Sequence, residues 1–205
     1  MINGILKIKN LFKVLIFIPL IFYFGERSYI AFDEGFYALQ ARRILDKGNW
    51  IIPLWWDKYV LDRTIGLQFL IGKSQELFGR NIFAAYIPTT TAAILMLYIT
   101  YKLHEEFFDK KYAILSPLIL ATTFLWFDYS HLATQDIIYS CLVTLGVFSL
   151  VKIKNKGNKF YILFFGIWIG LSFMMKTFLV FVPLISLLPY LFIKKNILYS
   201  KFFWL

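Results

Sequence analysis

The chain has little of what a water-soluble protein needs. Charged residues make up 17% of its 205 residues, against about 25% in soluble domains. Hydrophobic residues make up 60%, against roughly 45–50% in such domains, and a globule of 24.2 kDa cannot bury that much apolar surface. The single cysteine, Cys141, cannot form a disulfide within the chain. These shortages exclude a soluble enzyme, a disordered tail and a disulfide-stabilised scaffold, and they leave a multi-span membrane protein.

The chain also lacks the short motifs that indicate a nucleotide-binding site or a metal-binding site. It contains no GxGxxG, Walker loop, HExxH or paired CxxC. The formal net charge is +10, which in a soluble protein would suggest nucleic acid as a partner. In a membrane protein the same excess of lysine and arginine first reports orientation. We therefore expect no nucleic-acid partner.

Long apolar runs replace these missing features. A spanning helix needs about 20 mostly apolar residues. Six runs approach this length, at residues 14–25, 82–101, 113–127, 137–151, 160–175 and 178–193, and a further run begins at Ile197, close to the last residue. We expect residues 1–205 to form one all-α integral membrane domain with about six full spans and the start of a seventh.

Residues 64–79 are apolar on one helical face only. This pattern is typical of a helix that lies in the membrane interface. If the segment does not cross the membrane, the basic N-terminus and the loops 102–112 and 152–159 lie on one side, which the positive-inside rule assigns to the cytoplasm. Residues 26–81 then form a large external loop with interfacial amphipathic helices, one of which is predicted at 32–48.

Ionisable residues on the predicted external side gather near the ends of the apolar runs. They are Asp33, Glu34, Asp57, Asp62, Arg63, His131, Asp136 and Lys176. Each of these residues also has an ordinary structural explanation. The acids Asp33, Glu34 and Asp136 could simply cap or stabilise helix N-termini. Lys176 could be a snorkelling lysine at a helix end, and His131 could be a ring that lies in the membrane interface. Taken together, acids could remove a proton from an acceptor hydroxyl while cations stabilise a departing phosphate. The pattern favours transfer from a lipid phosphate.

An ordered series of residues runs along nearly the whole chain. It comprises Asp33-Glu34-x-x-Tyr37-Ala38, Arg43-x-Leu45-x-x-Gly48-x-Trp50-x-x-Pro53, Tyr59 with Asp62-Arg63, Leu77-Phe78-Gly79, Asp136 at the head of a run, and Gly170-Leu171-x-x-x-Met175-Lys176. The series resembles the bacterial 4-amino-4-deoxy-L-arabinose transferases and the related dolichyl-phosphate-mannose protein mannosyltransferases. These are integral-membrane glycosyltransferases of the GT-C fold.

The resemblance implies a GT-C-type helical bundle, a polyprenyl-phosphate-sugar donor and inverting transfer to a hydroxyl or phosphate acceptor on a lipid or a protein. It places the active site at the periplasmic face of a bacterial inner membrane, with the N-terminus in the cytoplasm. Its implied catalytic residues are Asp33, Asp136 and Glu34, its donor-phosphate ligands are Arg63 and Lys176, and its substrate contacts are Tyr37, Tyr59 and His131.

The sequence departs from this family at several positions. Asp62 and Thr64 replace the Glu and Pro that usually flank the position of Arg63, and Thr177 stands where a glycine often follows the lysine. A divalent cation near Asp62 is compatible with the sequence, although no spacing of ligands demands one. Family members also commonly exceed twice this length, so we expect a truncated or partial chain that holds the catalytic loops without the later spans.

Two other functions fit parts of the pattern. A transporter or flippase-like subunit would use the same membrane-depth charges as a pathway, although it would rarely need the long external loop. A non-catalytic remnant would fit the short length. The sequence names neither the sugar nor the acceptor.

Overall fold

The computed structural model describes residues 17–20, 28–29, 33–56, 58–60, 64–153, 159–194 and 197. The predictions for Asp57, Asp62 and Arg63, for most of the first apolar run and for the start of the seventh lie outside these residues. Within them the chain is almost entirely helical, as the sequence predicts.

The helices and strands follow one another along the chain in a fixed order. They are η1 (Ile18–Leu20), α2 (Asp33–Lys47), β1 (Leu54–Trp55), β2 (Lys58–Tyr59), α3 (Gly66–Phe78), α4 (Ile82–Phe107), η2 (Lys110–Tyr112), α5 (Leu115–Ala121), α6 (Phe124–Ser130), α7 (Gln135–Lys152), α8 (Lys159–Lys176), η3 (Thr177–Val180) and α9 (Phe181–Ile193). The two short strands form an antiparallel ribbon in which Leu54 faces Tyr59.

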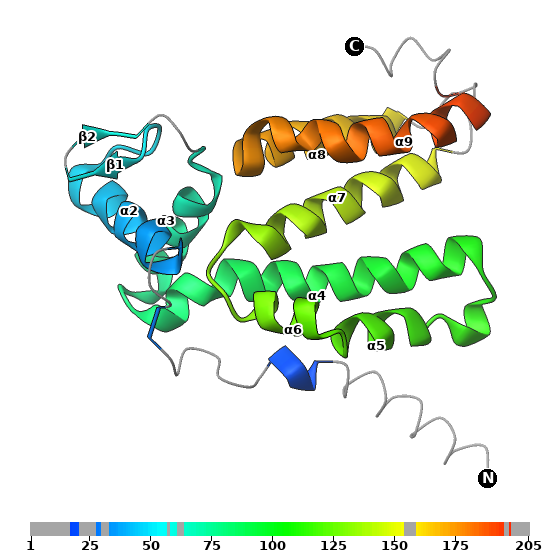
Figure 1. Cartoon of the computed structure of the whole chain (residues 1–205), viewed down its shortest axis with the longest axis horizontal. Helices are drawn as coiled ribbons and strands as arrows, with labels where there is room; N and C mark the ends of the chain where they lie inside the picture. The colour runs from blue at the N-terminus through cyan, green and yellow to red at the C-terminus, as the bar shows by residue number, and fades with distance from the viewer. Residues whose placement is uncertain are drawn as a thin grey trace.

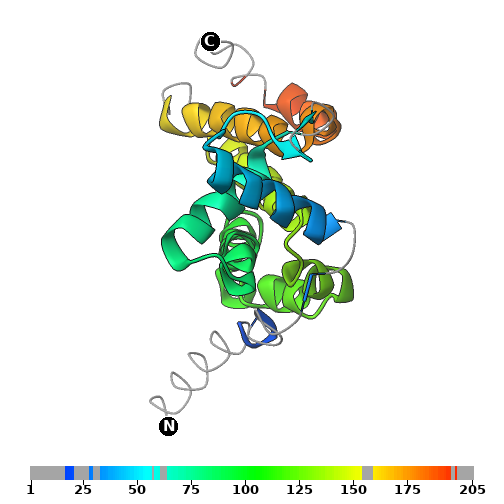
Figure 2. The same cartoon turned by 90° about the vertical axis from the view of Figure 1, so that its left-hand side faces the viewer.

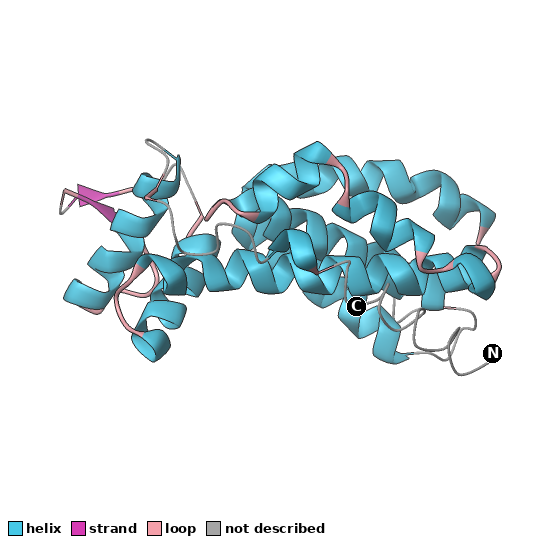
Figure 3. Cartoon of the chain, turned by 90° about the horizontal axis from the view of Figure 1, so that it is seen from below, coloured by secondary structure: helices cyan, strands magenta, loops and turns pink. Residues whose placement is uncertain are grey.

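The long helices α4, α7, α8 and α9 form a bundle, and α2, α3 and the ribbon form a smaller unit at one end of it (Figure 1). The helix α7 packs against both α4 and α8. Its neighbour α4 extends about 39 Å at 1.5 Å per residue. Seen from below, the smaller unit extends beyond the bundle (Figure 3). In Figure 2 the helix α2 crosses in front of the bundle, where α4 is seen nearly end-on. The small unit therefore caps one end of the bundle.

The helices α8 and α9 fold back on one another at η3 (Figure 1). Ile162 and Phe165, near the start of α8, share a hydrophobic cluster with Leu191, near the end of α9. Trp168 of α8 belongs to the same cluster, and a Cβ atom built on Gly146 of α7 would lie 2.2 Å from its ring. The glycine therefore permits a closer approach of α7 and α8 than any larger residue would.

Three helical stretches are long and apolar enough to cross a membrane: Ile82–Phe107, Gln135–Lys152 and the folded-back Lys159–Ile193. The predicted run 113–127 is divided into α5 and α6, which are bent by 68° and together count as one further candidate. At the bend the hydroxyls of Thr122 and Thr123 donate to main-chain carbonyls one turn earlier, which competes with continuation of the helix. The number of spans stays a prediction.

The helices of the small unit lie where the sequence predicts them, whereas the ribbon of β1 and β2 is not among the predictions. The helix α2 ends where Gly48 adopts a φ of +69° and its N–H donates to the Ile44 carbonyl at 2.8 Å, a common helix C-terminus. Along α3 the side chain of Leu67 is buried whereas Leu77 is exposed. A buried hydrogen bond of 2.7 Å from Gln68 to Gln40 joins α3 to α2. These contacts fix the position of α2 beside the bundle.

Candidate functional site

Two of the predicted site residues meet at the capped end of the bundle. The Lys176 Nζ lies 2.5 Å from the Asp136 Oδ1, although the residues are 40 positions apart. Asp136 belongs to the first turn of α7 and Lys176 is the last residue of α8, so the packing of these helices brings the two charges together. The side chains are 41% and 23% exposed, respectively. The ion pair is therefore accessible to a ligand.

The chain turns sharply directly after Lys176. Thr177 has a φ of +46°, in the left-handed region that a β-branched residue rarely adopts. The glycine that often follows the lysine in the resembling family would adopt this conformation without strain. The Tyr139 hydroxyl donates to the Leu179 carbonyl at 2.9 Å, and the Tyr139 ring centroid lies 5.8 Å from the Lys176 Nζ. Tyr139 thus holds the turned segment against α7.

The last turn of α8 is also held from the small unit. The Thr64 Oγ1 donates to the Met175 carbonyl at 3.1 Å. A Cβ atom built on Gly66 would lie 2.5 Å from the Met174 carbonyl oxygen, so only glycine fits at the start of α3. The main chain on either side of Lys176 is therefore fixed by residues from different elements.

The two predicted acids at the start of α2 have different environments. Glu34 is 1% exposed, and its Oε1 accepts a hydrogen bond of 2.6 Å from the Ala133 N–H, 99 residues away. Burial and, to a lesser degree, the Glu34 carboxylate raise the pKa of the Tyr29 phenol above its usual value. Asp33 is exposed. Glu34 thus joins α2 to the segment before α7, whereas the carboxylate of Asp33 is open to solvent.

Lys176 lines a cavity of about 240 Å³ between α2, α7 and the end of α8. Tyr37 from α2, Thr64 and Gln135 contribute to the same cavity. Tyr37 was predicted from the sequence, whereas Gln135 was not, although its place directly before Asp136 at the head of an apolar run was a usable signal. The cavity offers an ammonium group, a phenol, a hydroxyl and an amide to a ligand.

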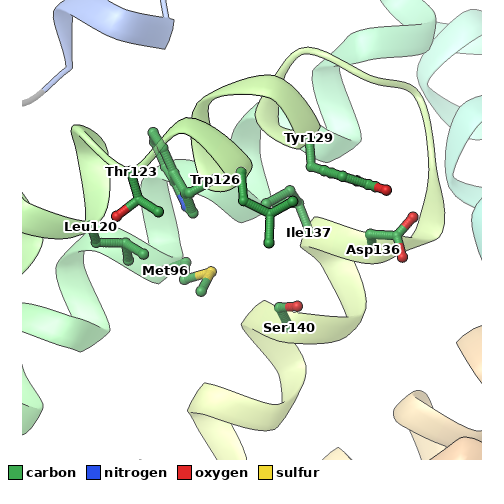
Figure 4. A pocket seen from close by; sticks show the side chains of 9 residues that line it. Met96, Leu120, Thr123, Trp126, Tyr129, Asp136, Ile137 and Ser140 are labelled. Carbon is green, nitrogen blue, oxygen red and sulfur yellow. The ribbon is translucent and has the colours of Figure 1, made fainter.

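A second cavity, of about 400 Å³, lies on the other side of the ion pair. Its walls are mostly apolar and come from α4, α5, α6 and α7, with Met96, Leu120, Trp126 and Ile137 among them. In Figure 4 the Asp136 carboxylate lies on the opposite side of this cavity from Leu120. The Asp136–Lys176 pair therefore stands between a polar cavity and an apolar one.

The remaining predicted residues lie elsewhere. The His131 Nδ1 lies 2.7 Å from the Phe127 carbonyl oxygen at the end of α6, and His131 is not among the residues that line either cavity. Tyr59 is 66% exposed on β2 and also lines neither cavity. Arg63 and Asp62 lie outside the described residues. Within the part of the chain that the structure describes, no three His, Cys, Asp or Glu residues gather as metal ligands would.

Comparison with known proteins shows which family and which fold the chain resembles. The sequence profile of the family named dolichyl-phosphate-mannose-protein mannosyltransferase matches residues 62–205. The undecaprenyl phosphate-alpha-4-amino-4-deoxy-L-arabinose arabinosyl transferase of Enterobacter sp. (strain 638) is 29% identical over an alignment of 176 positions, which covers 80% of this chain and 31% of that protein. The transferase of the same name from Pectobacterium carotovorum subsp. carotovorum (strain PC1) is 28% identical over an alignment of 209 positions, which covers 95% of this chain and 36% of that protein.

Two solved structures have the same fold. The structure of ArnT from Cupriavidus metallidurans in the apo state matches with a TM-score of 0.81 at 15% identity, covering 94% of this chain and 37% of that one. The structure of the same protein bound to undecaprenyl phosphate also matches with a TM-score of 0.81, at 16% identity, and covers 91% and 36%. The chain thus has the GT-C membrane fold and spans about a third of the length of these relatives. The apolar helices and this likeness identify a multi-pass protein of the inner membrane.

Proposed function

The chain belongs to the dolichyl-phosphate-mannose-protein mannosyltransferase family, and on that premise we propose that it transfers a sugar from a polyprenyl-phosphate donor to a hydroxyl or phosphate of a lipid or protein acceptor. The relatives are named for an undecaprenyl-phosphate-linked donor. The observation that carries the proposal is the Asp136–Lys176 pair between two cavities of opposite character. A lipid-linked sugar has the same division between a polar head and an apolar chain.

In this proposal Lys176 binds the donor phosphate. Its ammonium group lines the polar cavity, where a phosphate would replace the Asp136 carboxylate as its anionic partner. When the bond between the sugar and the phosphate breaks, the ammonium stabilises the negative charge that remains on the phosphate. Because Thr64 and Tyr139 fix the main chain near Lys176, little reorganisation accompanies this step.

Asp33 is the proposed general base. Asp33 and Tyr37 lie four residues apart in α2 and therefore on the same face of the helix, and Tyr37 lines the Lys176 cavity. An acceptor oxygen attacks the anomeric carbon while its proton passes to the Asp33 carboxylate and the polyprenyl phosphate departs. Glu34 is a positioning residue in this scheme, because its carboxylate is already bonded to the Ala133 N–H.

Substitutions in the protein, expressed from its gene, test the roles assigned to Asp33 and Lys176. Membranes that contain the protein are supplied with polyprenyl-phosphate-linked sugars, and the release of polyprenyl phosphate is followed. General-base catalysis contributes roughly 10²–10⁴-fold, so Asp33→Asn should lower the rate by at least about a hundredfold. Lys176→Met should raise the KM for the donor. Asp128→Asn, at an exposed acid of α6 that lines neither cavity, serves as the matched control. Full turnover in the Asp33→Asn protein, inserted normally, would refute the role of Asp33.

We further propose that the capped end of the bundle faces the periplasm and that the N-terminus lies in the cytoplasm, within a single domain of about six full spans and the start of a seventh. In support, η2 with its two lysines, the end of α7 at Lys152 and the start of α8 at Lys159 lie at the end of the bundle opposite to the small unit (Figure 1). In a Cys141→Ala background, Lys58→Cys should react with an impermeant thiol reagent in intact cells. Lys110→Cys should react only after the membrane is opened. The reverse pattern would overturn the orientation.

A further inference from the structure

A third cavity lies on the other side of α2 from the Lys176 cavity. It has a volume of about 360 Å³ and is enclosed by α2, the end of α3 and the start of α4. Along α2 the residues Gly35, Ala38 and Arg42 line this cavity, whereas Tyr37 lines the cavity at Lys176. No residue lines both cavities. Both cavities involve α2, which Figure 2 shows at the front of the molecule.

Two guanidinium groups give the third cavity its charge. Arg42 comes from α2 and Arg80 from the link between α3 and α4. The Arg80 Nη1 pairs with the Asp46 Oδ1 at 2.6 Å, and both of these side chains are partly exposed. The Asp46 carboxylate offsets one of the two positive charges, so a net positive charge remains. The planar fork of arginine matches the oxygens of a phosphate better than the ammonium of lysine does.

The start of α4 adds to the positive potential. Asn81 and Ile82, the first residues of this 26-residue helix, line the same cavity. The Asn81 side chain accepts a hydrogen bond of 2.7 Å from the Ala84 N–H, and the earlier N–H groups of the helix have no partner within the helix itself. The positive end of the helix dipole thus lies at the cavity that the two arginines also line.

The surface next to the third cavity is suited to a lipid bilayer. Leu77 and Phe78, at the end of α3, are 76% and 57% exposed and come just before Arg80. Large apolar side chains next to arginines are typical of helices that lie in the headgroup region of a membrane. The cavity itself contains Leu39 and Ile82 beside the arginines, so its walls could contact both a phosphate and the start of an acyl chain.

We propose that the cavity formed by Arg42, Arg80 and the start of α4 binds the phosphate-bearing headgroup of a membrane lipid. The site goes beyond the proposed transfer reaction and is independent of it, because none of these residues lines the cavities beside Lys176. It would hold a phospholipid, or an acceptor lipid that carries a phosphate, at the end of the molecule where the reaction takes place.

Binding of phosphatidic acid, a lipid with a terminal phosphate, tests the site. The full chain in a neutral detergent is titrated with phosphatidic acid, and the bound lipid is counted by native mass spectrometry. Since both cations are lost in Arg42→Gln/Arg80→Gln, the affinity should fall about thirtyfold. The matched control Arg43→Gln/Lys47→Gln removes two cations from the same unit at positions that do not line the cavity, and it should bind as the parent does.

The control variant, a competition with inorganic phosphate and a single substitution distinguish the possible results of this titration. Equal weakening in the cavity and control variants would show only a general attraction to cations and would overturn the site. If inorganic phosphate at the same concentration as the lipid displaces the lipid, the cavity recognises free phosphate. That result would overturn the assignment of a lipid headgroup as its ligand. If the double variant does not fold, Arg42→Lys decides. This substitution keeps the positive charge but removes the planar guanidinium, and it should weaken lipid binding several-fold. Unchanged binding would contradict the proposed contact between Arg42 and the phosphate.

Discussion

Thr177 provides the sharpest test of the geometry around Lys176. Its φ of +46° places a β-branched residue in the left-handed region, and this conformation turns the chain from α8 into η3. A glycine has no Cβ atom and adopts this conformation without the steric cost. We therefore expect Thr177→Gly to stabilise the protein, although most substitutions to glycine destabilise.

The size of the effect follows from two opposing contributions. A left-handed conformation costs an L-residue roughly 1–2 kcal/mol, and the substitution removes this cost. The greater freedom of glycine in the unfolded chain offsets about 0.4–1 kcal/mol of the gain. The net stabilisation should be about 0.5–1 kcal/mol. For a chain of this length, that corresponds to a rise of about 1–4 °C in the midpoint of thermal unfolding.

The only cysteine of the chain provides the assay. Cys141 is buried, at 2% exposure, in α7. A dye that fluoresces on reaction with thiols therefore reports unfolding in detergent as the temperature rises, without further labelling. Because membrane proteins often unfold irreversibly, the variants are compared as apparent midpoints at one scan rate.

Two further substitutions make the result decisive. Thr177→Ala keeps the Cβ atom and should give no rise in the midpoint. Thr144→Gly, at a half-buried helical threonine of α7 whose hydroxyl donates to the Ser140 carbonyl, should lower the midpoint because glycine is unfavourable within a helix. If Thr177→Gly lowered the midpoint as Thr144→Gly does, the left-handed conformation at Thr177 would be wrong.

Three other substitutions test further contacts. Tyr139→Phe removes the 2.9 Å hydrogen bond to η3 and should lower the thermal midpoint by the equivalent of about 1 kcal/mol; an unchanged midpoint would argue against that bond. Gly146→Ala forces a Cβ atom against the Trp168 ring and should cost about 1–3 kcal/mol, and a second change, Trp168→Leu, should recover part of the loss if the clash is its cause. Glu34→Gln removes a negative charge near Tyr29 and should lower the raised pKa of that phenol, while burial, the larger cause, still keeps it above its usual value. An alkaline absorbance titration against the Tyr29→Phe protein measures this shift, and a higher pKa would contradict the placement of Glu34.

The sequence by itself determined the features that depend on neighbours along the chain. The apolar runs predicted an all-helical membrane fold, and the alternation of charged and apolar residues predicted the helix that ends at Gly48. The predicted helix at 64–79 corresponds to α3, although packing against α2 and α4 also buries its polar residues Gln68 and Gln75 and leaves the apolar Leu77 exposed. These features follow from hydrophobic periodicity and from the conformational freedom of glycine, both of which act locally.

Only the tertiary structure decided which polar residues act together. Asp33 and Glu34 are adjacent, and the sequence treats them alike. Successive residues of a helix point in directions about 100° apart, so the packing of α2 buries Glu34 against Ala133 and leaves Asp33 exposed. The ion pair of Asp136 with Lys176 likewise depends on how α7 and α8 pack. Charges brought together across long stretches of chain leave no periodic signal, because their distance is set by the packing of whole helices.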